Sequence, residues 1–158
     1  MAQITIYTDG AAKGNPGNGG YGAVMLSGKH IKELSQGFVK TTNNRMELLS
    51  VIVALEQIKN EGADVTVYSD SKYVVDSVEK RWVFGWEKKG FAKKKNVDLW
   101  KRFLKVYKRH NVSFQWVKGH AGNELNERCD QLAVAAATGE SLVPDKGFEE
   151  QQKEGGLF

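Results

Sequence analysis

The sequence predicts an α/β fold in which helices flank a mixed sheet. Strand-like and helix-like segments alternate along much of the chain, which favours parallel strands joined by right-handed crossovers. The short turn Ser27-Gly28-Lys29-His30 separates two strand-like runs and predicts an antiparallel hairpin. With 158 residues, the chain has the size of one domain that can bury a substantial core.

The first strand is expected to begin near Ile4 and to be closed by Asp9-Gly10. β-branched and aromatic residues dominate positions 4–8, as in typical strands. Asp9 therefore lies at the carboxyl end of a predicted central strand, where α/β folds bind their ligands. Asp-Gly after a strand is also a common turn signal, so a plain turn residue is the alternative interpretation of Asp9.

A glycine-rich run follows, and two further strands are expected over residues 21–26 and 31–39. The spacing Gly17-x-Gly19-x-x-Gly22 formally matches a dinucleotide-binding fingerprint. That motif requires a helix directly after the glycines, whereas a strand is predicted here, so we reject it. We expect these glycines to belong to a mobile or tightly turning connection.

A long helix is predicted over residues 45–61, ending at Gly62, and it carries Glu47 in its first turn. Glu47 precedes apolar residues by four, seven and eleven positions, which places it at the edge of the apolar stripe or within it. A capping box with Asn44 is the alternative, and the local sequence does not decide between the two.

The next predicted strand, 65–69, is followed by Asp70 and by a helix that runs through Val78. The helix between the strands predicts that strand 65–69 is parallel to the first strand. Asp9 and Asp70 then end parallel strands at the same sheet edge, with Glu47 reaching in from the connecting helix. Adjacent strands lie less than about 5 Å apart, so these carboxylates could share an ion. An ordinary helix N-cap is the alternative for Asp70.

The last third of the chain is expected to form helix 97–109, strand 112–117, a loop at 118–122 and helix 123–138. Asp130 projects from the last helix along a face of small apolar residues, where a buried carboxylate without a partner would be costly. Residues 1–138 are expected to form the domain. Residues 139–158 are polar and acidic, which predicts a poorly ordered, flexible tail.

Residues 80–95, here called the basic segment, combine positive charge with aromatic rings. Seven Lys or Arg residues stand against one acidic residue, Glu87, in a chain of net charge +4. The aromatic residues of the segment are Trp82, Phe84, Trp86 and Phe91. A solvated helix face would explain the charges but not the aromatic residues. Because this mixture is typical of proteins that bind a phosphate backbone, we expect a nucleic-acid partner.

Composition and spacing exclude several other classes. No apolar run approaches the roughly 20 residues of a membrane span, and no secretory signal is visible, so we expect a cytoplasmic protein without membrane contact. The single cysteine, Cys129, cannot form an internal disulfide, which suits a reducing compartment. Neither zinc-site spacing nor a Gly-x-Ser-x-Gly serine motif is present. We expect a monomer, because no spare apolar face is left over.

Five longer motifs stand in order along the chain. They are Thr8-Asp9-Gly10 with Gly14-Asn15-Pro16-Gly17, then Thr42-Asn43-Asn44-Arg45-Met46-Glu47-Leu48, Ser69-Asp70-Ser71, Trp116-Val117-Lys118-Gly119-His120-Ala121-Gly122, and Asn126-Glu127-Arg128-Cys129-Asp130. Together they resemble bacterial type 1 ribonuclease H over about residues 2–138. Separate turn, capping and surface interpretations of the four carboxylates do not account for this joint agreement.

The resemblance implies a ribonuclease H-like fold with a five-stranded mixed sheet, three antiparallel strands followed by parallel strands. It also implies an endonuclease that hydrolyses the RNA strand of RNA/DNA hybrids, leaving 5′-phosphate and 3′-hydroxyl ends. The family's four carboxylates correspond to Asp9, Glu47, Asp70 and Asp130, which would hold two Mg²⁺ ions, with Mn²⁺ as the alternative. Asp9 would bridge both ions. Glu47 and Asp70 would complete one site and Asp130 the other, while His120 would shuttle a proton or assist product release.

Substrate contacts follow from the same resemblance. Asn15, Asn43 and Asn44 would lie near the minor groove of the hybrid, where 2′-hydroxyl groups distinguish RNA from DNA. Lys40 and Thr42 would contact a phosphate of the DNA strand. The remaining implied contacts, most of them in the basic segment, are Lys72, Trp82, Trp86, Lys88, Lys89, Lys93, Lys94, Lys95 and Asn96.

The chain departs from the family pattern in two places. Lys72 stands where relatives often have glutamine, which exchanges an amide that can read a base edge for a point charge and favours a phosphate contact. The lysine run 93–95 is shorter than the corresponding loop, so its grip on the backbone is expected to be weaker or differently placed. The alternatives are a non-catalytic hybrid-binding module, which would lack a metal carboxylate, and an integrase-like strand-transfer enzyme, which would carry extra DNA-binding domains.

Overall fold

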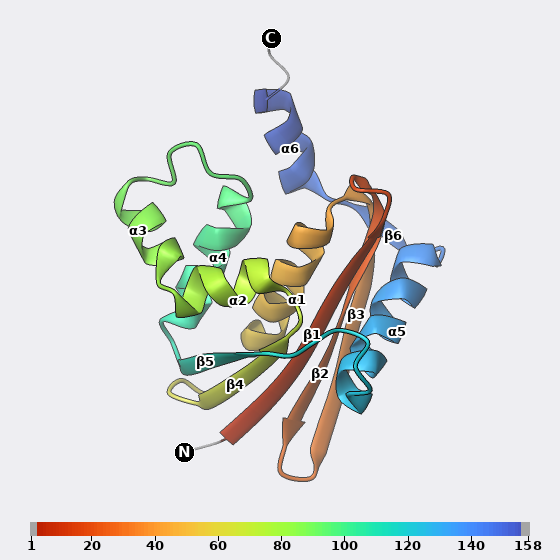
Figure 1. Ribbon diagram of the computed structural model, residues 1–158, viewed down its shortest axis with the longest axis vertical. Helices are drawn as coiled ribbons and strands as arrows, with labels where there is room; N and C mark the ends of the chain where they lie inside the picture. The colour runs from red at the N-terminus through yellow and green to blue at the C-terminus, as the bar shows by residue number, and fades with distance from the viewer. Residues whose placement is uncertain (1–2, 156–158) are drawn as a thin grey trace.

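A six-stranded mixed sheet forms the centre of the protein in the computed structural model, which describes residues 3–155 (Figure 1). The strands are β1 Gln3–Lys13, β2 Gly17–Ser27, β3 His30–Thr41, β4 Asp64–Ser69, β5 Asn111–Trp116 and β6 Leu142–Pro144. They lie in the order β5-β4-β1-β2-β3-β6. β2 pairs antiparallel with β1 and β3, whereas β4 is parallel to both β1 and β5. The predicted mixed sheet and hairpin are therefore confirmed.

Helices pack on both faces of this sheet (Figure 1). They are α1 Asn43–Glu56, α2 Lys72–Glu79, α3 Trp82–Lys88, α4 Val97–Tyr107, α5 Glu124–Thr138 and α6 Lys146–Gly155. α1 packs on β1 and β2 and is covered by α4, whereas α5 lies on the opposite face. Among residues 3–155, no helix has both the length and the apolar character needed to cross a membrane.

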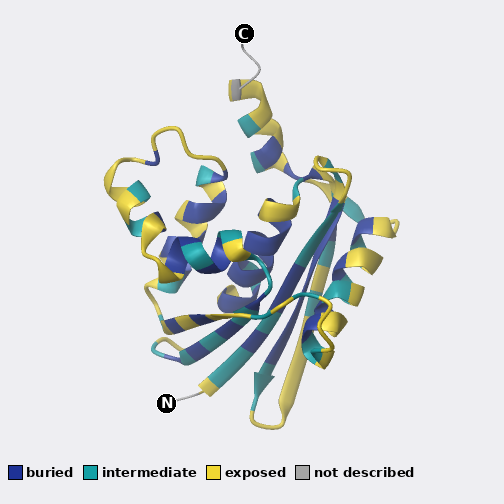
Figure 2. Ribbon diagram, in the orientation of Figure 1, coloured by how far each residue is buried: buried dark blue, intermediate teal, exposed yellow. Residues whose placement is uncertain are grey.

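The main core lies between the sheet and α1, where the ribbon is most continuously buried (Figure 2). Leu48, Val51, Ile52 and Leu55 of α1 are fully buried, which confirms the apolar face expected from helical spacing. α1 ends at Glu56, five residues before the predicted end. The chain turns there, and the Gly62 N–H donates to the carbonyl of Arg109 at 2.9 Å instead of continuing a helix.

The sheet has six strands and not the five predicted, because β6 pairs in parallel with Gly37–Val39 of β3. α6 follows β6 directly, so residues 142–155 form regular structure. The expectation of a poorly ordered tail is wrong for these residues, and positions 156–158 lie outside the described residues. Buried Asp145 and Phe148 fix the segment to the domain, a long-range contact that composition alone does not reveal.

The glycine run also differs from its expectation, since Gly17 to Gly22 belong to β2 and not to a mobile connection. Two of these residues, Gly20 and Gly22, face α5, which crosses the sheet closely. A Cβ atom added at Gly20 would lie 2.7 Å from the carbonyl oxygen of Ala133 and 2.8 Å from the backbone nitrogen of Ala137, both in α5. Glycine is needed here for the close approach of α5 to the sheet, and not for a turn.

β1 continues past the predicted stop at Gly10. Its antiparallel pairing with β2 extends from Thr5 to Lys13, while its parallel pairing with β4 ends at the pair Thr8–Ser69. Asp9 therefore lies inside a strand, but at the point where the parallel part of the sheet ends. This edge is where the sequence placed the candidate site.

Candidate active site

Asp9, Glu47 and Asp70 come together at the edge where β1 and β4 stop pairing. One carboxylate oxygen of each side chain lies within 4.8 Å of one from each of the others. Asp9 and Asp70 each follow a residue of the last parallel pair, and Glu47 comes from the first turns of α1. The structure thus brings together the three carboxylates that the strand order had placed at one edge.

Gly10 allows Glu47 to approach Asp9. A Cβ atom at Gly10 would lie 2.5 Å from the carbonyl carbon and 2.8 Å from the Cβ of Met46, and it would also collide with the backbone nitrogen of Glu47. The start of α1 therefore rests directly on the backbone of β1. In the sequence, Gly10 closes the predicted first strand and belongs to the motif Thr8-Asp9-Gly10, but no pattern there predicts a contact with α1. The position of Gly10 directly after Asp9 was the one feature of the sequence that could have indicated this close approach.

The residues that cap the two helices near the site are Thr42 and Ser71, and not Glu47 or Asp70. Thr42 caps α1, its hydroxyl accepting the Arg45 N–H at 3.2 Å. Ser71 caps α2, its hydroxyl accepting the Val74 N–H at 3.2 Å. The capping explanations of Glu47 and Asp70 are therefore wrong, and both carboxylates lie in the cleft.

Burial raises the pKa values of the three clustered carboxylates. Asp9 is 5% exposed, and burial, aided by the charges of Asp70 and Asp130, raises its pKa to about 7. Burial and the neighbouring Asp9 charge raise the pKa of Glu47 well above its ordinary value, and burial also raises the pKa of Asp70. One buried oxygen of Glu47, Oε2, has no hydrogen-bond partner. Like charges at this separation repel unless a cation is bound, so the donor set fits a divalent metal.

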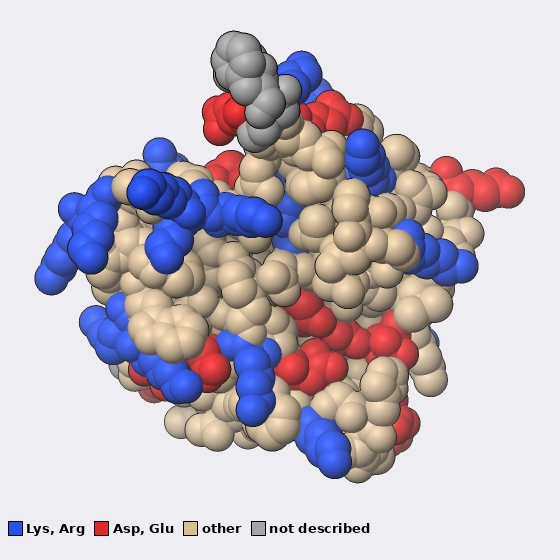
Figure 3. Space-filling view, turned by 45° about the horizontal axis from the view of Figure 1, so that its top comes forward, with Lys and Arg blue, Asp and Glu red and all other residues tan. Residues whose placement is uncertain are grey.

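The carboxylates line an open cleft of about 430 Å³. Asp130 of α5 and His120 line the same cleft, although Asp130 lies outside the group of three close oxygens. His120 is exposed on the loop before α5, with a φ of +55°. In the space-filling view, acidic side chains gather in one region, with Lys and Arg concentrated beside it over the α3 side of the molecule (Figure 3).

A sequence profile of the RNase H family matches residues 1–138. The chain belongs to the ribonuclease H family. The ribonuclease H of Desulforamulus reducens is 57% identical over 150 residues, which cover 92% of this chain and 94% of that protein. The ribonuclease H of Pseudoalteromonas atlantica is 54% identical over 154 residues, covering 94% and 99% respectively. Identity at this level over nearly the whole of each protein shows the enzyme class as well as the family.

Solved structures agree on the fold. LC9-RNase H1, a type 1 RNase H with the type 2 active-site motif, is 31% identical with a TM-score of 0.78, covering 96% of this chain and 81% of that one. LC11-RNase H1, solved in complex with an RNA/DNA hybrid, is 28% identical with a TM-score of 0.62, covering 85% and 96%. The ribonuclease H-like fold expected from the sequence is confirmed.

Several of the residues that the resemblance assigned to substrate lie around the ribonuclease H cleft. Asn43 and Asn44 line it directly. Asn15 is beside them, since its Oδ1 accepts the Asn43 N–H at 3.2 Å. Lys40 is exposed two residues before Thr42, the α1 cap. The structure thus places Asn43 and Asn44 in the cleft with the carboxylates, and Asn15 in contact with Asn43.

Lys72 also lines the cleft, at the start of α2. Its Nζ lies 4.8 Å from the centroid of the Trp116 ring, a cation–π distance. Trp116 in turn donates its Nε1–H to the carbonyl oxygen of Asp70 at 3.1 Å. Sequence reasoning placed Trp116 in a family motif without giving it a task, and this contact shows that it packs beside the acidic cluster.

The basic segment contains α3, a helix that the sequence did not predict. Its five lysines between 88 and 95 are exposed, and Trp82 is 47% exposed. The other aromatic residues face inward. Phe91 is buried, Phe84 is partly buried against the core, and Trp86 stacks edge-on against Trp100 with ring centroids 5.8 Å apart. Most of these rings therefore anchor the segment to the core, which corrects the inference that they mark a binding surface.

Asn96, which follows the basic segment, is 5% exposed. Its Nδ2 donates to the Tyr73 hydroxyl at 3.1 Å, and its Oδ1 accepts from Arg45 Nη1 at 3.4 Å. Its side chain is thus engaged inside the protein and is not presented to a ligand.

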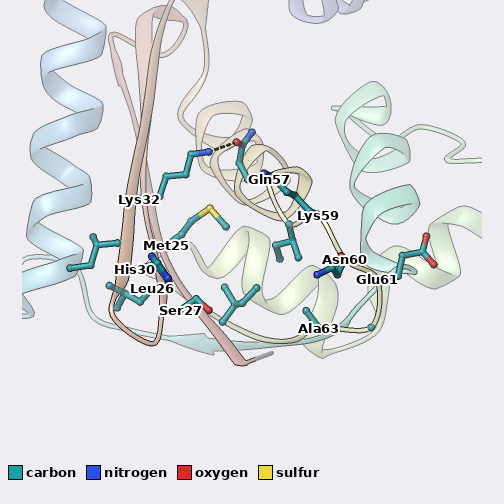
Figure 4. A pocket seen from close by; sticks show the side chains of 14 residues that line it. Met25, Leu26, Ser27, His30, Lys32, Gln57, Lys59, Asn60, Glu61 and Ala63 are labelled. Carbon is teal, nitrogen blue, oxygen red and sulfur yellow. Dashed lines mark hydrogen bonds between the residues drawn. The ribbon is translucent and has the colours of Figure 1, made fainter. Parts of the chain in front are cut away.

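A larger hollow of about 900 Å³ lies between the β2–β3 hairpin and the end of α1 (Figure 4). Its lining is mainly apolar, with Lys32 hydrogen-bonded to Gln57 at 2.8 Å. None of the residues that the sequence assigned to catalysis or substrate lines it. The candidate active site is therefore the smaller, acidic cleft.

Proposed function

We propose that this member of the ribonuclease H family hydrolyses the RNA strand of RNA/DNA hybrids in the acidic cleft, leaving 5′-phosphate and 3′-hydroxyl ends. The observation that carries the proposal is the group of three carboxylates with oxygens within 4.8 Å of one another. The hybrid bound to LC11-RNase H1 supports the same substrate class for this chain.

Two Mg²⁺ ions suit the donors of the cleft, with Mn²⁺ as the alternative. Mg²⁺ prefers oxygen ligands and is usually held by a few carboxylates together with phosphate oxygens. Asp9, which neighbours both Glu47 and Asp70, would be shared between the ions, with Glu47 and Asp70 completing one site and Asp130 the other. When bound, the ions would activate the attacking water and stabilise the leaving oxygen.

The side chains around the carboxylates would bind and orient the hybrid. Asn15, Asn43 and Asn44 carry amide groups that can bond to 2′-hydroxyls, which only the RNA strand has. His120 is exposed at the rim of the same cleft, where an imidazole can accept a proton or assist the departure of product.

Positive side chains would hold the phosphate backbone away from the carboxylates. As the family resemblance implies, Lys40 and Thr42 would contact one phosphate, and Lys72, which lines the cleft, would contact a second. The exposed lysines at 88, 89 and 93–95, with Trp82, would contact backbone farther along the hybrid. We also propose that the chain acts as a cytoplasmic monomer, a setting that suits the buried thiol of Cys129.

The test is cleavage of a labelled RNA strand that is paired to DNA, paired to RNA, or single-stranded, each with Mg²⁺, with Mn²⁺ and with chelator. We expect cleavage of the hybrid alone and only with metal. Asp70→Asn should fold normally and lose turnover, because it removes one negative ligand from the cluster. Asp76→Asn is the matched control, since Asp76 pairs with Lys80 at 3.6 Å on the neighbouring helix and should retain full activity.

Three results would contradict the proposal. Asp70→Asn that cleaves at a rate near that of the wild type would remove Asp70 from the metal ligands. Wild-type protein that binds the hybrid but cuts it with neither ion would instead favour the non-catalytic binding module. Cleavage of all three substrates would refute the substrate class.

A further inference from the structure

The substrate loop, residues 40–44, joins β3 to α1 and carries four of the proposed hybrid contacts. Lys40 has a φ of +48°, a conformation that residues other than glycine adopt only rarely. Residues outside the loop hold its backbone. The Asn43 N–H donates to Asn15, and the Lys40 N–H donates to Asn18 Oδ1 at 3.3 Å. Thr41 and Arg45, at either side of Thr42, provide further contacts that reach outside β3 and α1.

Asp145, just before α6, contacts the loop at both ends. Thr41 Oγ1 donates to Asp145 Oδ2 at 2.7 Å. Arg45, the first residue after the loop, donates from Nε to the same oxygen at 2.8 Å and from Nη2 to Oδ1 at 3.0 Å. Asp145 is itself held by α6, because Oδ1 accepts the Phe148 N–H at 3.1 Å. The exposed fractions of Thr41, Arg45 and Asp145 are 0, 1 and 7%, so these bonds are shielded from water.

β6 and α6 are also linked to the residues that directly follow the basic segment. Arg45 donates to both oxygens of Asp98, at 2.8 and 2.7 Å, in the first turn of α4. Gln151 of α6 accepts the N–H of Asn96 at 2.6 Å. Gly147 leaves room for this packing, since a Cβ there would lie 2.6 Å from Arg45 Nη2 and collide with the Asp98 carboxylate.

We propose that Asp145 is a positioning residue for the hybrid. In this proposal, β6 and α6 form a brace that holds the substrate loop and the basic segment in a fixed position relative to each other. This inference rests on the proposed function, because both braced parts are proposed hybrid contacts. Asp145 is buried, so it acts through Thr41 and Arg45 and does not touch the substrate. A loop that is fixed before binding loses less conformational entropy on binding, so the brace strengthens hybrid binding. The carboxylate cluster has a further support that Asp145 does not provide, the packing of α1 on Gly10.

The test compares KM and kcat of Asp145→Ala and Asp145→Asn on the hybrid, well below their melting temperatures. For Asp145→Ala we expect KM to rise by about fivefold or more, with kcat changed by less than about twofold. Asp145→Asn keeps an acceptor for Thr41 but loses the charge, so its KM should be intermediate. Val112→Ala is the control, because Val112 is buried at the end of β5 away from the cleft and its truncation lowers stability alone.

A second pair of variants keeps the test valid if Asp145→Ala does not fold. Thr41→Val removes only the hydroxyl bond to Asp145, and Gly147→Ala disturbs the Arg45–Asp98 packing. Both variants should raise KM, as Asp145→Ala does. KM equal to that of Val112→Ala at matched stability would overturn the brace and leave Asp145 a purely structural role. A fall in kcat with KM unchanged would overturn it as well.

Hybrid binding measured by fluorescence anisotropy in chelator separates the two proposals. If the wild type binds the hybrid without cutting it, the proposed catalysis fails, yet affinity about fivefold weaker in Asp145→Ala would still support the brace. Equal affinity of wild type and variant would overturn the brace even if catalysis is established.

Discussion

Replacing Asp9 with asparagine should stabilise the protein when no divalent ion is bound. Asp9 lies against two other carboxylates in a buried cluster, and its own pKa is raised from 3.8 to about 7, mainly by burial. Asparagine has nearly the same shape and carries no charge. The substitution therefore removes a buried charge, and with it the repulsion from the neighbouring carboxylates, while leaving the packing of β1 unchanged.

The expected size follows from the change in pKa. The difference of about 3 between the folded value and 3.8 corresponds to about 4 kcal/mol at 1.36 kcal/mol per pKa unit. This is an upper bound, because Glu47 and Asp70 share the same repulsion, and we expect about 1–3 kcal/mol. The folded chain keeps a proton on Asp9 to higher pH than the unfolded chain. The free energy of unfolding of the wild type therefore falls as pH rises from about 4 to about 7, and it stays lowered above that.

Urea or thermal unfolding in chelator at pH 8 and pH 4 measures this effect. Asp9→Asn should be more stable than the wild type at pH 8, by about 2–4 °C in Tm for each kcal/mol, and the gain should shrink at pH 4. Added Mg²⁺ should stabilise the wild type, by about 2.7 kcal/mol at one hundred times Kd, and leave the variant largely unchanged. A variant that is no more stable than the wild type at pH 8, or a gain independent of pH, would refute the electrostatic reasoning.

Two further predictions concern the surface and the core. Replacing all three lysines at 93–95 with glutamine should weaken hybrid binding and reduce the slope of log K against log salt by up to about 0.9 for each lost phosphate contact. An unchanged slope would remove these lysines from the binding surface, and Lys59→Gln, on the far hollow, is the matched control. Cys129 is fully buried and burial raises the pKa of its thiol to about 12, so a thiol reagent should react with it only after unfolding. Rapid labelling of the native protein would contradict this burial.

The sequence by itself determined the fold class and, with the resemblance of its motifs to ribonuclease H, the three central carboxylates. Alternation of strand-like and helix-like segments required β1 and β4 to be parallel, and parallel neighbours end at one edge. Asp9 and Asp70 were therefore expected to meet. Helical spacing placed Glu47 at the edge of the apolar stripe or within it, and the resemblance to ribonuclease H joined Glu47 to the other two carboxylates. These inferences rest on local periodicity and on chain connectivity, which are both written in the sequence.

Only the tertiary structure decided which distant residues these elements contact. Arg45 pairs with Asp145, one hundred residues away, and this pair fixes a C-terminal strand and helix where composition indicated a flexible tail. Three aromatic residues of the basic segment, Phe84, Trp86 and Phe91, pack against the core that includes Trp100, whereas Trp82 stays exposed. Local patterns report which face of an element is apolar. They do not report which distant residue will complete a buried ion pair or cover a ring, because such partners meet only when the chain has folded.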